Sequence, residues 1–175
     1  FNTRYTEIHA AIAIEQLKKL PDLLEWRIEN AQYLNSELSQ FPGIRGSVIR
    51  EDCKHVYYVQ PMDFNRDLVG VERNVFVDAV AAELPSSPDR EGIPLVWSGY
   101  GKPLYLLPMY QQKSAIGGKG CPFDCPHYEG QVDYSIGICP VVEKVEKESL
   151  FMNDFIRPPA TVEDMRDVVR AFEKV

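Results

Sequence analysis

The chain has 175 residues, of which 45% are hydrophobic and 26% are charged, a composition typical of a soluble globular domain that can bury a core. Its net charge of −7 argues against a nucleic-acid surface, which needs a basic stripe. No apolar run approaches the roughly 18 residues of a membrane span, and no signal peptide is visible. We therefore expect a cytoplasmic protein without a membrane or nucleic-acid partner.

Helical patterns fill the first 40 residues. Thr6 is a suitable N-cap, with Glu7 in the first turn, and apolar residues then fall on nearly every side of a helix up to Leu20. Apolar residues all round indicate packing on more than one surface. Pro21 either kinks one long helix or starts a second one over residues 22–38. Since the chain also begins at Phe1 without a Met, we expect a fragment of a longer protein.

The remainder predicts a small sheet covered by helices. Clusters of β-branched and aromatic residues predict strands at residues 55–62, 94–98 and 150–155. Apolar periodicity predicts helices at residues 72–84, 139–150 and 162–175, the last one capped by Thr161. Residues 99–137 show no clear period, and a loop of this length is usually functional or packed against another chain. The order of elements indicates an α+β fold, with connecting helices at residues 1–40 and a small domain at residues 41–175.

The first block of the chain carries a resemblance to a known family. Residues 2–11 read NTRYTEIHAA, which resembles the signature of the DegT/DnrJ/StrS sugar aminotransferases: Asn-x-Arg, an apolar residue, Ser/Thr, an acidic residue, an apolar residue, Gln and Ala-Ala. His9 replaces the usual Gln. Further similar segments follow in the family's order: His55-Val56-Tyr57-Tyr58, Gly92-Ile93-Pro94, Pro103-Leu104-Tyr105 and Cys139-Pro140 with Glu143. The chain departs from the pattern by an insertion at residues 84–90. Because of this insertion, the substrate of any one family member is not assigned to this chain.

This resemblance implies the C-terminal small domain of a fold-type-I aminotransferase, with a small, mostly antiparallel sheet preceded by long N-terminal helices. In the family, a lysine of the large domain forms a Schiff base with pyridoxal phosphate. None of the nine lysines here stands in a matching segment, so we expect this chain alone to be inactive and assign no catalytic residue. The whole enzyme would be a homodimer that transfers an amino group from glutamate or glutamine to a keto-sugar, such as a nucleotide sugar, or to a keto-cyclitol.

The same resemblance suggests binding residues. Asn2 would reach the cofactor phosphate of the neighbouring subunit, where a neutral amide donor suits a phosphate already held by a helix N-terminus. Arg4 would support that loop or meet an anionic substrate group; alternatively, both residues merely cap the first helix. His55, Tyr100 and Tyr105 are candidates for substrate binding, because a tyrosine offers a flat face and a hydroxyl. The alternative for these three residues is an ordinary structural role.

The sequence allows two other interpretations. Cys121, Cys125 and His127, with Cys139 later in the chain, are suitable zinc ligands, but the paired short spacings of a structural site are absent and no metal is predicted. A second class of function stays open, namely a non-catalytic binding, dimerisation or regulatory module derived from the same family. The sequence preceding Phe1 separates the two classes, because a large α/β domain with a Schiff-base lysine supports the enzyme.

Overall fold

The computed structural model describes residues 4–86, 94–114, 120–123 and 128–175. In chain order the first elements are α1 (Glu7–Leu38), β1 (Ile44–Gly46), β2 (Gln60–Phe64), α2 (Arg66–Val69), α3 (Arg73–Glu83) and β3 (Val96–Ser98). They are followed by the 3-10 turn η2 (Leu104–Leu106), α4 (Pro108–Gln111), α5 (Pro140–Lys144), the π-helical turn η3 (Val145–Ser149), β4 (Leu150–Asn153) and α6 (Val162–Lys174).

Four strands of the described residues form one sheet in the spatial order β1-β2-β4-β3. Every neighbouring pair is antiparallel, with Gln60 of β2 and Val96 of β3 both opposite Asn153 of β4. Side chains alternate along a strand, so Gln60, Met62 and Phe64 share the buried face. The predicted α+β fold with a small antiparallel sheet is confirmed.

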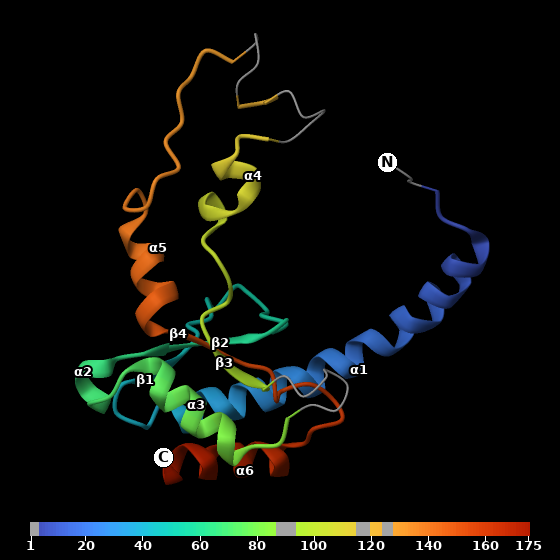
Figure 1. The fold of residues 1–175 in the computed structure, drawn as a ribbon. Coiled ribbons are helices and arrows are strands. Elements are labelled where there is room, and N and C mark those ends of the chain that lie inside the picture. The colour runs from blue at the N-terminus through green and yellow to red at the C-terminus, as the bar shows by residue number, and fades with distance from the viewer. Residues whose placement is uncertain (1–3, 87–93, 115–119, 124–127) are drawn as a thin grey trace.

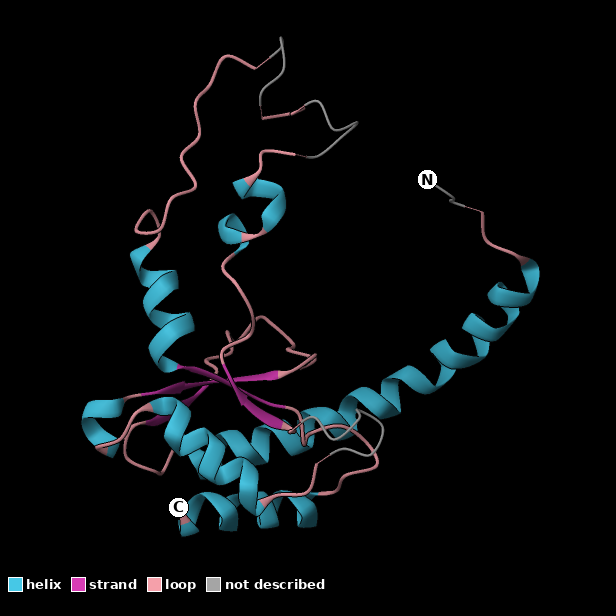
Figure 2. Cartoon of the chain, viewed as in Figure 1, coloured by secondary structure: helices cyan, strands magenta, loops and turns pink. Residues whose placement is uncertain are grey.

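The core lies between one face of this sheet and helices α1, α3 and α6 (Figures 1 and 2). Leu34 of α1, Phe151 of β4 and Met165 of α6 are fully buried. The ring of Phe172 lies 5.8 Å from that of Phe76 and 6.1 Å from that of Phe151, between centroids. Each such side chain contributes about 1.5–3 kcal/mol on burial, so this layer holds the three helices to the sheet. Helices α4 and α5 rise from the opposite side (Figure 1).

Helix α1 is one continuous helix of 32 residues that contains Pro21, so this proline does not start a second helix. Thr6 is its N-cap, as predicted, and accepts a hydrogen bond from the backbone N–H of His9. The C-terminal third of α1 is packed in the core, whereas its N-terminal half extends away from the sheet (Figure 1). That half exposes large aliphatic side chains: Ile8, Ile12, Ile14, Leu17, Leu20 and Leu23. Such a surface is typical of an interface with further protein.

Neither α1 nor any other helix within the described ranges combines the length and the hydropathy that crossing a bilayer requires.

Three predicted elements are displaced. The strand expected at residues 55–62 begins only at Gln60 and runs to Phe64, because Tyr57 takes a positive φ of 47° and packs against α1. The strand expected to reach residue 155 ends at Asn153, whose side-chain oxygen accepts the N–H of Phe155 and turns the chain. The helix expected over residues 139–150 widens into a π-turn at Val145 and ends at Ser149. The three-residue β1 was not predicted at all.

Helix α6 begins with the predicted cap, in which the Asp164 carboxylate accepts hydrogen bonds from the N–H (2.6 Å) and the hydroxyl (2.8 Å) of Thr161. These bonds hold the pKa of Asp164 below its usual range. We expect Asp164→Ala to lower the free energy of unfolding by about 1 kcal/mol at neutral pH. A carboxylate whose pKa is lower in the folded than in the unfolded state stabilises the fold while it is ionised, and this stabilisation is lost when it is protonated. The difference in stability between the variant and the wild type should therefore vanish as the pH falls through the lowered pKa of Asp164.

Urea denaturation at neutral pH and at about pH 2 measures both effects. Glu173→Ala, at an exposed position of the same helix, is the control and should change the stability by less than about 0.5 kcal/mol. An equal loss for Asp164→Ala at both pH values would contradict the role of the carboxylate.

Candidate functional site

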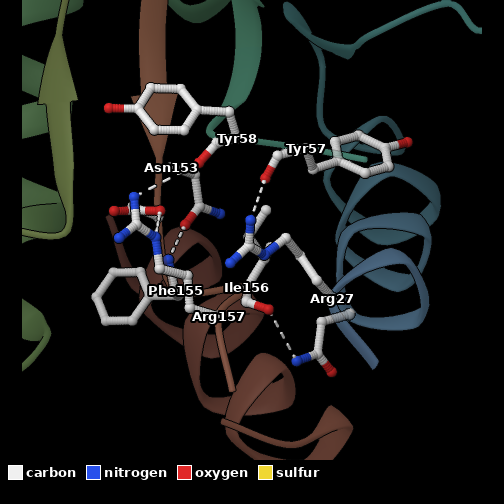
Figure 3. Close-up of polar contacts among 9 residues, drawn as sticks. Arg27, Tyr57, Tyr58, Asn153, Phe155, Ile156 and Arg157 are labelled. Carbon is white, nitrogen blue, oxygen red and sulfur yellow. Dashed lines mark hydrogen bonds and ion pairs between the residues drawn. The ribbon is translucent and has the colours of Figure 1, made fainter. Parts of the chain in front are cut away.

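The turn before β2, residues 55–58, is fixed against α1. The Tyr57 ring is fully buried, and its hydroxyl accepts a hydrogen bond from Asn35 Nδ2 at 3.3 Å; burial raises the pKa of Tyr57. The N–H of Tyr57 donates to His55 Nδ1 at 3.0 Å, and the two rings lie 4.2 Å apart between centroids. Arg27 Nη1 donates to the Tyr57 carbonyl at 3.5 Å (Figure 3). Since Nδ1 of His55 is an acceptor here, a neutral His55 carries its proton on Nε2, and its side chain is exposed.

Tyr58 points the opposite way from Tyr57 and lies beside Arg157 (Figure 3). The Arg157 guanidinium carbon is 5.9 Å from the centre of the Tyr58 ring, a cation–π distance. The same guanidinium donates to the Asp154 carboxylate at 2.6 Å and to the Tyr58 carbonyl at 3.5 Å. Asp154 is buried at 2% exposure. This ion pair therefore fixes Arg157, whose guanidinium lies over the Tyr58 ring.

The phenols of Tyr58 and Tyr100 interact. Loss of solvent contact, and then the charge and the hydrogen bond of Tyr58, raise the pKa of Tyr100. The side chains are still 67% and 54% exposed, respectively. The pair therefore exposes aromatic surface to solvent, which suits stacking against a sugar ring.

Tyr105 occupies a different setting. It is buried at 9% exposure, and its hydroxyl donates to the Glu143 carboxylate, which also accepts the N–H of Gly137 at 2.7 Å. Burial, with the neighbouring Glu143, raises the pKa of Tyr105 to about 12. The Tyr105 hydroxyl bond lowers the pKa of Glu143. The hydroxyl of Tyr105 is thus engaged in joining η2 to α5, and its assignment to a substrate pocket stays a prediction.

The predicted cofactor residues lie elsewhere. Asn2 falls outside the described residues, and Arg4 is exposed just before α1, at the end of the helix remote from the sheet (Figure 1). The first buried residue of α1, Ile28, lies 21 positions after Glu7, which is about 30 Å of helix. Within one chain the structure therefore brings Tyr58, Tyr100 and Arg157 together and separates Arg4 from them.

Tyr58 and Arg157 were missed as candidate site residues. Tyr58 belongs to a segment that resembles the family. What distinguishes it from the neighbouring Tyr57 is its exposure in the structure, and no alternation in the sequence reveals which of the two rings is exposed. Arg157 is 99 residues away from Tyr58 in the chain, and no motif marks it.

The metal and cofactor chemistry of the described residues is limited. Cys125 and His127 of the zinc hypothesis lie outside the described residues, and within the described ranges no three His, Cys, Asp or Glu side chains come together as a metal site. The described lysines are all exposed: Lys18, Lys19, Lys54, Lys102, Lys113, Lys144, Lys147 and Lys174. A Schiff-base lysine needs a desolvated pocket or a neighbouring cation to lower its pKa. These lysines do not fit covalent attachment of pyridoxal phosphate, and no step through the cofactor is assigned to them.

Comparisons with known proteins identify the family of the chain. The model of the DegT/DnrJ/EryC1/StrS aminotransferase family matches residues 1–123. An uncharacterized protein of Methanocaldococcus jannaschii, MJ1066, is 24% identical over 170 residues, and the spore coat polysaccharide biosynthesis protein SpsC of Bacillus subtilis is 20% identical over 169 residues. Each match covers 97% of this chain and 36% of the relative, so the chain spans just over a third of the curated relatives' length.

A solved structure shows the same fold. DesV of S. venezuelae, determined in complex with a ketimine intermediate, matches with a TM-score of 0.66 at 19% identity, over 98% of this chain and 36% of that one. The resemblance seen in the sequence is therefore confirmed, including its restriction to the C-terminal portion of longer proteins. Because the family model covers more than half of its residues, this chain belongs to the DegT/DnrJ/EryC1/StrS aminotransferase family.

Proposed function

We propose that this chain is the C-terminal part of a homodimeric, pyridoxal-phosphate-dependent aminotransferase that aminates a keto-sugar or keto-cyclitol with glutamate or glutamine as the amino donor. Family membership and the 36% coverage of longer relatives support this proposal. The name of SpsC, a polysaccharide biosynthesis protein, favours a sugar as the substrate class. In this protein, α1 would connect the small domain, from about residue 41, to the large domain that carries the cofactor lysine.

The observation that carries the proposal is the exposed N-terminal half of α1. Its aliphatic side chains, Leu17 among them at 62% exposure, need a protein surface to cover them, and the part of a longer relative that this chain does not span supplies one. Arg4 precedes about 30 Å of helix that lies N-terminal to the first buried residue of α1, Ile28. In a two-fold dimer, the start of the chain would then contact the cofactor of one active site, while Tyr58 and Tyr100 line the other.

The described residues bind and orient; they do not form bonds with the substrate. Tyr58 and Tyr100 provide an aromatic wall for the sugar ring, and Arg157 keeps the Tyr58 ring in place. His55 orients a substrate hydroxyl through its exposed Nε2, because Nδ1 is used to hold the turn. The pyridoxal phosphate of the whole enzyme supplies the electron sink for amino transfer.

The proposal is tested by the visible spectrum, after addition of pyridoxal phosphate, of this chain beside a version extended upstream through the missing domain. Borohydride reduction followed by intact mass measurement then shows whether a lysine holds the cofactor. When unbound pyridoxal phosphate is removed before the reduction, we expect a cofactor-derived mass increase in the extended protein only, since the described lysines of this chain are exposed and release the cofactor with the solvent. If neither version gains this mass, the enzyme proposal fails and a non-catalytic binding or dimerisation module takes its place.

A further inference from the structure

The chain that leaves β3 donates hydrogen bonds from three consecutive residues to the segment that contains η3 and the start of β4. Gly99 N–H donates to the Leu150 carbonyl at 2.7 Å, which extends the sheet by one bond. The N–H of Tyr100 then donates to both carboxylate oxygens of Glu146, at 3.2 and 3.1 Å, and the N–H of Gly101 donates to Oε1 at 3.2 Å. Two consecutive amides converging on one anion form the concave arrangement known from backbone anion sites. Here the anion is a side chain of the same molecule.

Gly99 makes this arrangement possible in two ways. Its φ of +67° is a left-handed conformation that favours glycine. In addition, a Cβ at this position would lie 2.4 Å from Oε1 of Glu146, so the carboxylate packs directly against the backbone of the turn. The position of the Glu146 side chain and the shape of the turn therefore depend on each other.

Glu146 is itself held by a buried cation. Arg73 of α3, at 5% exposure, donates through Nη1 to the carbonyls of Glu146 (2.7 Å) and Leu150 (2.6 Å). Its Nε and Nη2 donate to Asn74 Oδ1. Burial lowers the pKa of Arg73, and the charge of Glu146 opposes that change. Arg73 thus binds the backbone of the π-turn η3 at the residue whose side chain accepts the amides of Tyr100 and Gly101.

We propose that Glu146 is the positioning residue for Tyr100, because it fixes the backbone amides of Tyr100 and Gly101 and thereby directs the Tyr100 ring toward Tyr58. The placement of the ring follows from the contacts of this chain alone. The consequence for substrate binding rests on the proposed function, in which the Tyr58–Tyr100 pair lines the sugar site.

The placement is tested on the 175-residue chain by NMR contacts between the Tyr58 and Tyr100 rings. We expect this contact in the wild type and its loss in Glu146→Ala, which removes the acceptor, and in Gly99→Ala, whose Cβ displaces it. Glu148→Ala, an exposed glutamate of the same turn, is the matched control and should keep the contact. Glu146→Gln is the second variant, for the case in which Glu146→Ala does not fold. It retains one acceptor oxygen and should weaken the contact between the two rings. Retention of the wild-type contact in a folded Glu146→Ala or Glu146→Gln variant would overturn the proposal.

The consequence for binding is tested in the extended enzyme by steady-state kinetics with a nucleotide-linked keto-sugar. We expect Tyr100→Ala and Glu146→Ala each to raise KM for the sugar about fivefold to tenfold, with little change in kcat, and the double variant to match the single ones. Additive effects of the two changes would overturn the positioning role, because Glu146 would then act independently of Tyr100. If Tyr100→Ala leaves KM unchanged while the ring contact is lost in Glu146→Ala, it is the proposed substrate role of Tyr100 that fails, and the positioning of its ring stands.

Discussion

Phe151→Ala should lower the free energy of unfolding of this chain by about 3–5 kcal/mol, the largest loss that we expect from a single side chain. Phe151 is fully buried in the central strand β4, opposite Met62 of β2 and Ser98 of β3. Its ring faces that of Phe172 in α6, 6.1 Å away between centroids. The close-packed neighbours cannot fill the cavity that truncation leaves, so the loss combines transfer and cavity costs.

Urea denaturation followed by circular dichroism measures this loss. The control is Val141→Ala on α5, where the side chain is 75% exposed and the expected change is within about 0.5 kcal/mol. A loss below about 1 kcal/mol for Phe151→Ala would mean that the sheet does not depend on this packing layer.

Pro21→Ala should protect the backbone amides of residues 7–20 from hydrogen exchange, on the order of a hundredfold, without changing the urea midpoint of the chain. A proline in a helix interior costs about 3 kcal/mol relative to alanine, because it lacks an N–H and its ring meets the preceding turn. The N-terminal half of α1 is exposed, so its formation in this chain depends on local propensity and not on the core.

Lys19→Ala, an exposed residue of the same half, serves as the control because it leaves the proline in place. Strong protection of residues 7–20 in the wild type would contradict the prediction, since it would show that contacts within the chain hold this half. In the extended protein, by contrast, the same amides should be protected in both variants if the proposed large domain covers α1.

The sequence predicted those parts of the fold whose signals are local. Helix α6 is the clearest case, because its apolar residues recur every three or four positions and its cap is adjacent in sequence. The predicted buried stripe is buried in the structure: Met165, Val168, Val169 and Phe172. By contrast, the aromatic run at residues 55–58 suggested a strand, although Tyr57 takes a positive φ there. Composition alone does not distinguish a strand from a tightly packed turn.

The candidate site depended on contacts that no local pattern contains. Arg157 meets Tyr58 across 99 residues, and Glu146 meets Tyr100 across 46, in both cases because the order of the strands brings distant loops together. The chemistry of their side chains made the exposed His55 and Tyr100 candidates, and the resemblance placed Glu143 at the start of α5. It could not reveal that Tyr105 bonds to Glu143, since that contact depends on how the loop after β3 lies along the helix.

The central position of β4 determines when this domain can fold during synthesis. β4 is the last strand to be made, yet both β2 and β3 pair with it, so an emerging chain has only the β1–β2 pair until residues 150–153 leave the ribosome. At about 5–20 residues per second, β2 waits roughly 5–20 s with one edge open, which makes it accessible to unwanted strand pairing. A product that terminates before β4 retains most of its sequence but lacks the strand that joins the sheet, and we expect quality-control proteases to degrade it.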